Sequence, residues 1–463
     1  MKILMITIDN RPVCYDFPKM CANIDDESEL ILPERKFFGD LTRNADVDAL
    51  FGFLENNLNA DYVVISADTL LYGGLIPSRR VDYSFEFLKN RVEKLKRFCE
   101  KFSGKTFVFS SIMRISDNNI NDEEKVYWND FGKKIFRYSY LSHKSEKLGE
   151  TYDLPKIPEE ILTDYLNTRK RNFEINKILA ECAKTGVFDY LIFTKDDCAK
   201  FGFNIKEAEL LAEIAQNSGN IKIETGADEL PESLLAKCFS SRFGAAKIFP
   251  KYVFPKSIQK ISRYEDVSVK NSVETQVCRA GAKIADDEAC ADLVMYVNNF
   301  ENEQGELVFE IRNEEFSGNF EKVEPPCFYA DIANANGADN GFVNAVFETD
   351  YRNFYGYSAW NTTGNTLGGA VCVALVKFFS KKNGTYNDDA FKILQSVRFL
   401  DDWAYQANIR KTGAPLPESS DLSQMFLPFE KKIAGFLDIN TRFSYSFPWN
   451  RTFEIQVRPE IFI

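Results

Sequence analysis

The fold is decided by residues 62–79, YVVISADTLLYGGLIPSR. The stretch starts with the apolar run 62–66, which does not alternate with polar residues. Such a run is typical of a strand that is buried on both faces, as in a parallel sheet. The run passes directly into Asp68, and Arg79 follows a pair of glycines. The stretch therefore predicts a buried parallel strand with polar side chains at its carboxyl end.

Similar apolar runs recur along the chain, with helical patterns between them. The further strand candidates are residues 2–7, 106–112, 190–194, 221–225, 293–298, 328–330 and 354–358, with weaker ones at 29–32 and 247–254. Helical patterns cover residues 85–102, 158–185, 206–218, 232–239, 273–284 and 388–409. Strands that alternate with helices predict an α/β fold.

We expect two Rossmann-like parallel-sheet lobes with a cleft at the carboxyl ends of their strands. The predicted division is an N-terminal α/β lobe over residues 1–244, a second lobe over 245–384, and a helical tail over 385–463 that packs back on the lobes. A (β/α)8-like barrel with extra elements is the alternative. The polar residues 115–155 are expected to form an irregular insertion or a lid.

The composition limits the chemistry. The 463 residues include 57 Lys and Arg, 69 Asp and Glu, and one His, which gives a net charge of −12. A single His excludes sites that need two or more imidazoles. His143 itself stands in a polar run, so we expect it on the surface. The acidic balance argues against a nucleic-acid partner.

The compartment follows from the cysteines and from the apolar runs. The ten cysteines are spread singly, without a CxxC pair, as is typical of reduced thiols. The first residues lack the apolar core of a signal peptide, and no run of about 18 apolar residues indicates a membrane span. We therefore expect a cytoplasmic protein with no membrane partner.

Nearly every strand candidate runs directly into polar residues. At the carboxyl ends of parallel strands, such residues line the ligand site of an α/β fold. An Asp or Asn at this position also caps the helix that follows, and for any one residue the two interpretations are about equally good. The residues expected to bind substrate are Asp9, Asn10, Arg11, Tyr72, Arg79, Arg114, Arg169, Asn172, Asn298, Asp331, Asn336, Trp360, Asn361, Asn365 and Asp402.

These residue types favour a carbohydrate-active hydrolase, a glycosidase. Glycoside hydrolysis needs two carboxyl groups and no imidazole. The candidate catalytic carboxyl groups are Asp196 or Asp197, paired with Asp228 or Glu229, and Asp68. The arginines suit an acidic or phosphorylated sugar. Trp360 beside Asn361 and Asn365 suits stacking on a sugar ring, so the expected partner is a small sugar-like substrate.

Two other functions remain open. Clustered Asp and Asn oxygens could hold Mg²⁺ or Mn²⁺ in a metal-dependent hydrolase or phosphoryl-transfer enzyme. Apart from such a divalent metal, no cofactor is expected. The chain could also be a two-lobed protein that binds a small molecule without converting it. The oligomeric state is left open.

Ten motifs together give the chain a resemblance. They are IDNRPV, SADTLLYGGLIPSR, IMR, RKRNFEIN, KDDCAKFG, GADE, YADIANANGAD, YSAWNTTGNTLGG, RFLDDWAYQ and FPWNRTFE. In combination they resemble the bacterial family catalogued as domain of unknown function 4127. The motifs are spread from Asp9 to Glu454, so the resemblance covers nearly the whole chain. It implies that these segments belong together as a unit, and it names no activity.

Overall fold

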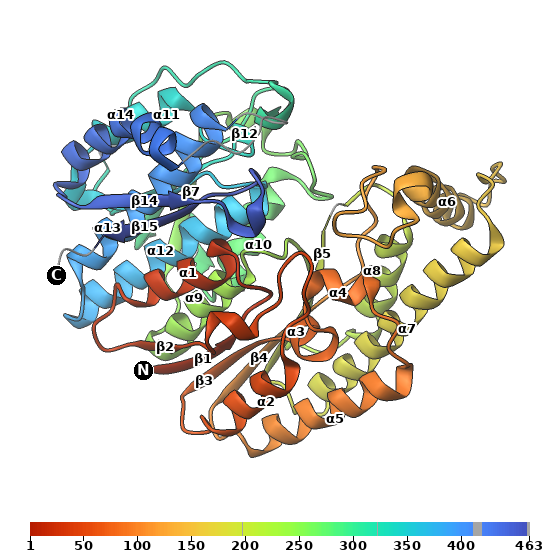
Figure 1. Ribbon diagram of the computed structural model, residues 1–463. Coiled ribbons are helices and arrows are strands. Elements are labelled where there is room, and N and C mark those ends of the chain that lie inside the picture. Colours follow the sequence, from red (N-terminus) through yellow and green to blue (C-terminus); the bar gives the residue numbers. More distant parts are fainter. Residues whose placement is uncertain (197, 322, 411–418, 461–463) are drawn as a thin grey trace. The chain divides into compact units, whose positions relative to one another are not determined.

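The computed structural model describes residues 1–196, 198–321, 323–410 and 419–460, and it has an α/β fold with two open parallel sheets (Figure 1). The chain forms two compact units. Unit 1 consists of residues 1–10, 30–228 and 264–266, and unit 2 of residues 11–29, 229–263 and 267–463. The prediction of two parallel-sheet lobes is confirmed. In the described residues neither sheet closes into a barrel.

The bounds of the units differ from the predicted division of the chain. Residues 11–29 and 229–244 belong to unit 2 rather than to the N-terminal lobe, and residues 385–463 belong to unit 2 as well. The early segment is part of unit 2 because α1 (Pro12–Ala22) packs against α9 (Leu230–Phe243) and α13 (Asp388–Arg398). The chain therefore enters unit 2 once before it completes unit 1.

The sheet of unit 1 has six strands in the order β2-β1-β3-β4-β5-β6. They are β1 (Lys2–Ile6), β2 (Glu29–Ile31), β3 (Tyr62–Ser66), β4 (Lys105–Ser111), β5 (Tyr190–Lys195) and β6 (Ile221–Thr225). All five residues of β3 are buried, as expected for a strand that is covered on both faces. The order 2-1-3-4-5 is one of the two common doubly wound orders, and its ligand site lies at the carboxyl ends of the strands.

Helices connect these strands. They are α2 (Val47–Glu55), α3 (Ala67–Tyr72), α4 (Leu75–Arg80), α5 (Phe85–Lys101), α6 (Trp128–Leu148), α7 (Glu159–Lys184) and α8 (Phe203–Ile214). In α5 the buried residues include Leu88, Val92 and Leu95, whose spacing of three and four makes one apolar stripe. Helices α5 and α7 pack against each other (Figure 1).

Helix α6 differs from two predictions, the irregular structure of residues 115–155 and the exposure of His143. Residues 128–148 form a helix of 21 residues instead of irregular structure, and its buried residues are Trp128, Gly132, Ile135, Ser139 and His143. Their spacing of three and four is helical, but small and polar side chains hide the stripe from a hydrophobicity pattern. The prediction that His143 lies on the surface is wrong, because it is 1% exposed. Its Nδ1 atom accepts a hydrogen bond from the Gly202 N–H at 3.1 Å.

The main sheet of unit 2 has five parallel strands in the order β13-β11-β9-β7-β8. They are β7 (Lys247–Tyr252), β8 (Lys283–Ile284), β9 (Leu293–Asn298), β11 (Cys327–Asp331) and β13 (Phe354–Ser358). If these five strands are renumbered 1 to 5 in chain order, their order from the β8 edge is again 2-1-3-4-5. In this order the connections change direction between β7 and β9, which is the switch point where ligands bind. All ten predicted strands are present in the two sheets.

Smaller elements complete unit 2. They are α10 (Val269–Arg279), α11 (Asn340–Phe347), α12 (Thr363–Asn383), α14 (Ser419–Leu437), the π-helix Phe399–Ile409, the strand pair β10 (Gly305–Glu306) and β12 (Asn334–Ala335), and the strand pair β14 (Arg442–Ser446) and β15 (Gln456–Glu460). Helix α12 is almost entirely buried and begins with a capping box between Thr362 and Asn365.

Candidate active site

Asp68 is the buried acid at the carboxyl end of β3. It lies in the first turn of α3, which begins where the Ser66 side chain accepts from the Thr69 N–H, and ends at Gly73 with a left-handed φ of 93°. Asp68 is 2% exposed. Its Oδ2 atom accepts from the Ser111 N–H at 2.8 Å. Burial raises the pKa of Asp68 to about 6, although the Ser111 bonds and the charge of Arg79 act to lower it.

Arg79, at the end of α4, lies near this acid, and Arg114, after β4, lies near Arg79. Arg79 is 2% exposed, and none of its three guanidinium nitrogens forms a hydrogen bond within the described residues. Burial and the neighbouring charge of Arg114 lower the pKa of Arg79. Arg114 is more open, and its Nη1 atom lies 3.9 Å from Asp196 Oδ2. The buried hydroxyl of Tyr72 also has no hydrogen-bond partner among the described residues.

Two adjacent glutamates hold the arginines in place. Glu124 Oε1 lies 3.4 Å from Arg79 Nε and 3.3 Å from Arg114 Nε. Glu123 Oε2 lies 3.5 Å from Arg79 Nη2 and 2.7 Å from Arg114 Nη2. The Arg80 side chain donates to the backbone oxygens of Glu124 and Leu41, which fixes the loop that carries the glutamates. We call Asp68, Tyr72, Arg79, Arg114 and Asp196 the unit 1 cluster.

Arg169 and Asn172, on α7, contact the backbone next to the arginines of this cluster. Arg169 donates to both carboxylate oxygens of Glu207, at 2.9 and 2.6 Å, and its Nη1 atom lies 3.5 Å from the backbone oxygen of Arg114. Asn172 Nδ2 donates to the Ser78 backbone oxygen at 2.9 Å. Both side chains are engaged with protein atoms, which favours a role in positioning Arg79 and Arg114.

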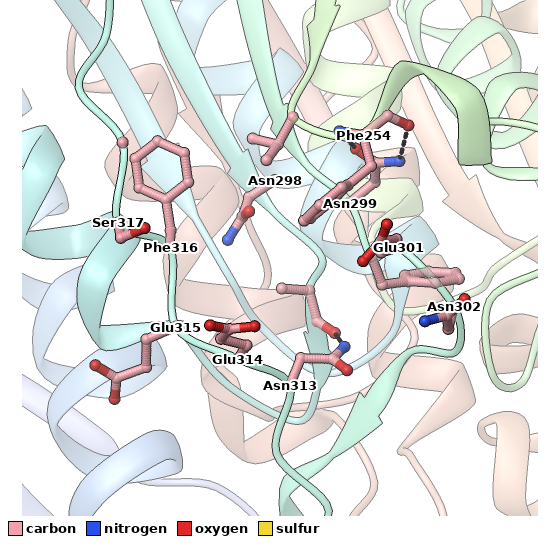
Figure 2. A pocket seen from close by; sticks show the side chains of 14 residues that line it. Phe254, Asn298, Asn299, Glu301, Asn302, Asn313, Glu314, Glu315, Phe316 and Ser317 are labelled. Atoms are coloured by element: carbon pink, nitrogen blue, oxygen red, sulfur yellow. Dashed lines mark hydrogen bonds between the residues drawn. The ribbon is translucent and has the colours of Figure 1, made fainter.

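A cavity of about 510 Å³ lies in unit 2 at the carboxyl ends of β7 and β9 (Figure 2). Its lining combines amides, carboxylates and phenyl rings, among them Phe254, Asn298, Glu301, Asn302, Glu314 and Phe316. The location is the switch point of the unit 2 sheet, where the doubly wound topology leaves a crevice. We call it the unit 2 cavity.

Two buried carboxyl groups fix the walls of the unit 2 cavity. Asp331 Oδ1 accepts from Asn298 Nδ2 at 2.8 Å, and Asp331 Oδ2 accepts from the Asp339 N–H at 2.6 Å. Burial and the neighbouring carboxylate of Asp339 raise the pKa of Asp331. Asp339 in turn accepts from the backbone N–H groups of Phe316 and Phe342. Asp331 therefore orients the Asn298 amide, and Asp339 holds Phe316 in the opposite wall.

The remaining predicted residues at the ends of β11 and β13 are used in local structure. Asn336 and Asn361 have left-handed φ values of 61° and 58°, and the Asn336 N–H donates to the Asn361 backbone oxygen at 2.8 Å. Asn336 Nδ2 donates to Glu306 Oε1 at 2.9 Å. Trp360 is 2% exposed and packs edge-on against Phe453. The Arg11 guanidinium lies 5.2 Å from the ring centre of Trp449.

The family described as protein of unknown function (DUF4127) matches residues 3–458. The chain belongs to this family. All ten motifs that carried the resemblance lie within the matched range. A search of the curated proteins found no match.

Three predicted site residues of this DUF4127 chain lie in the core of unit 2. Glu229 is fully buried, and its Oε1 atom accepts from Arg279 Nη1 and Gln276 Nε2, both at 2.8 Å. Its Oε2 atom accepts from Asn365 Nδ2 at 2.6 Å. Asp402 Oδ2 accepts from the Ala359 N–H at 2.7 Å. These bonds favour a structural role for Glu229, Asn365 and Asp402.

The other predicted residues of unit 1 lie at the ends of its strands. Asp9 is buried, and Asn10 and Asp228 are half-buried. Asp197 lies outside the described residues. Adjacent residues Asp228 and Glu229 belong to different units, because the division of the chain falls between them.

The sequence patterns did not indicate four residues that contact the unit 1 cluster or line the unit 2 cavity. Glu123 and Glu124 hold Arg79 and Arg114, yet the run NDEEK that contains them resembles an ordinary solvated loop. Glu314 and Phe316 line the unit 2 cavity from a segment without a strand or helix pattern. A search of the described residues found no group of three His, Cys, Asp or Glu placed to hold a metal ion. It also found no helix with the length and apolarity that crossing a bilayer demands.

Proposed function

We propose that the protein is a glycoside hydrolase that acts on an acidic or phosphorylated sugar at the unit 1 cluster. The observation that carries the proposal is a buried carboxyl group, Asp68, with a pKa of about 6 close to the guanidinium of Arg79. A carboxyl group with a pKa of about 6 is protonated far more often near neutral pH than an ordinary carboxyl group, which suits a general acid.

The arginines supply the preference for an acidic substrate. Arg79 and Arg114 share the same two glutamates, so their guanidinium groups are held close together. A planar guanidinium matches the geometry of a carboxylate or a phosphate. Arg114 and Asp196 are the more exposed members of the cluster, at 18% and 37%, and form its solvent side.

The reaction adds water across the glycosidic bond. Asp68 donates its proton to the glycosidic oxygen, and the bond between that oxygen and the anomeric carbon breaks. Water attacks the anomeric carbon, and the proton of the water passes to the Asp196 carboxylate. Removal of one such carboxyl group typically slows the reaction by about 100-fold or more. This scheme needs no cofactor, and the singly spread cysteines favour the reducing cytoplasm as its compartment.

A panel of chromogenic glycosides tests the proposal. Acidic members, the uronides and 6-phosphoglycosides, are compared with neutral glycosides of the same ring configuration. We expect the chain to release the chromophore from at least one acidic member, Asp68→Asn to slow this about 100-fold, and Asp48→Asn, whose side chain is 97% exposed on α2, to leave it unchanged. No hydrolysis of any acidic member by the unaltered chain, or full activity of Asp68→Asn, would overturn the proposal.

A further inference from the structure

The unit 2 cavity has a polar group that points to a ligand. Asn298 is 2% exposed, and its Nδ2 atom is bound to Asp331, so the amide cannot rotate without losing a buried hydrogen bond. Figure 2 shows this amide projecting into the cavity. Among the described residues, the hydrogen bonds of this side chain are limited to the one with Asp331, so its Oδ1 atom accepts no hydrogen bond from them. The fixed amide therefore presents an acceptor oxygen to whatever occupies the cavity.

The charge of the lining selects against anions. The fourteen described lining residues include Glu301, Glu314 and Glu315, and none of them is Lys, Arg or His. Glu315 accepts from Asn340 Nδ2 at 3.1 Å and points away from the cavity, whereas Glu314 lies below the Asn298 amide and Glu301 to its right in Figure 2. Lys260, just outside the lining, donates from its Nζ atom to the Asn302 backbone oxygen at 3.0 Å. Glu301 and Glu314 form no ion pair with the described residues, which favours a positively charged group beside them.

The apolar walls suit the same ligand. Phe316 is held by the bond from its backbone N–H to Asp339 and stacks against Phe320 at 5.6 Å between ring centres. Phe254 is fixed by two bonds of 2.9 Å to the Asn299 side chain. The faces of phenyl rings attract cations and pack on the C–H surface of sugar rings. A cavity of about 510 Å³ is in the range that holds one small molecule.

We propose that the unit 2 cavity binds a protonated amino sugar. Glu301 and Glu314 pair with its ammonium group, the Asn298 oxygen accepts from one of its hydroxyl groups, and Phe316 covers one face of the ring. This assignment does not depend on the proposed hydrolase, because the residues that carry it all belong to unit 2 and the unit 1 cluster contributes none of them.

Calorimetric titration of the full chain at pH 6 with four probes tests this assignment. Glucosamine carries the ammonium group, glucose and N-acetylglucosamine lack it, and glucuronate carries a negative charge instead. We expect glucosamine to bind at least about tenfold more tightly than glucose or N-acetylglucosamine, as a charge-assisted hydrogen bond provides. Any heat from glucuronate, which the unit 1 cluster is proposed to bind, is expected to be the same in Glu301→Gln and Glu314→Gln as in the unaltered chain. Equal affinities for glucosamine and glucose would overturn the assignment.

Matched variants separate this cavity from other sites. Glu314→Gln and Glu301→Gln alter exposed carboxylates, so both should fold, and each should weaken glucosamine binding about tenfold. Glu303→Gln alters an exposed carboxylate outside the lining and should leave the affinity unchanged. Asp68→Asn should also leave it unchanged, which distinguishes the result from a failure of the proposed hydrolase. Unchanged glucosamine affinity in both the Glu301 and the Glu314 variants would contradict the assignment.

Discussion

The Nε atom of Arg79 lies 3.4 Å from Oε1 of Glu124, and the two side chains are only 2% and 5% exposed. A buried ion pair adds little net stability, but the loss of one partner leaves an uncompensated charge in a region of low dielectric. In unit 1 this pair therefore fixes the orientation of Arg79 beside Asp68 more than it stabilises the fold.

Replacement of Arg79 tests this buried pair. We expect Arg79→Met to lower the free energy of unfolding by about 3 kcal/mol, because Glu124 loses one of its two guanidinium neighbours. Lys36→Ala, which removes an exposed pair with Glu34 in the same unit, should cost less than about 1 kcal/mol. Urea unfolding of the two variants measures both values. Equal costs would contradict a buried, functionally oriented Arg79.

The raised pKa of Asp68 predicts a pH-dependent stability. Because its pKa in the folded chain is about 6 and its ordinary value is 3.8, Asp68 contributes stability that is complete below pH 3.8 and is lost as the pH rises through 6. The total loss is about 3 kcal/mol, about half of it between pH 5 and pH 8. Asp68→Asn stays neutral, so its stability relative to the unaltered chain should rise over this range.

Urea unfolding at pH 5 and pH 8 measures the difference between Asp68→Asn and the unaltered chain. Asp48→Asn serves as the control, since its side chain is 97% exposed in the same unit. A difference that stays constant between the two pH values would show that Asp68 titrates as an ordinary exposed carboxyl group.

Gly368, in α12, lies so close to Glu229 that a larger residue should be destabilising at this position. A Cβ atom on Gly368 would lie 2.6 Å from Glu229 Cγ, so Gly368→Ala should destabilise unit 2 by about 2 kcal/mol although alanine favours a helix. Gly435, in α14 of the same unit, has no atom within 4 Å of such a Cβ. Gly435→Ala should therefore stabilise by about 0.5–1 kcal/mol. Thermal unfolding of both variants measures whether each change lowers or raises the stability. Stabilisation by Gly368→Ala would contradict the tight packing.

The strands were predictable because their burial is visible in the sequence. Runs such as residues 62–66 and 293–298 are buried along their whole length, and continuous apolar residues signal that directly. The polar ends of the strands predicted Asp68, Arg79 and Arg114 as site residues, and the fold places Arg79 near both Asp68 and Arg114. The order 2-1-3-4-5 occurs in both sheets, with β6 added at the edge in unit 1, yet no sequence repeat reveals it.

Other features depend on contacts that no local pattern records. His143 and Ser139 lie on the buried stripe of α6, where hydrogen bonds replace apolar contacts. Glu124 stands 45 positions from Arg79 and reaches it only through the folded loop. Asp228 and Glu229 are neighbours with similar chemistry, but one is half-buried in unit 1 and the other is fully buried beside Arg279 in unit 2.

The pH dependence of kcat/KM for an acidic glycoside, measured with the unaltered chain and with Asp68→Asn, tests the proposed hydrolase most directly. The unaltered chain should lose activity as the pH rises through about 6, where Asp68 gives up the proton that it donates. Asp68→Asn should retain about one hundredth of the activity or less and lack this limb. An identical profile and rate in the two proteins would contradict the assignment of Asp68 as the acid.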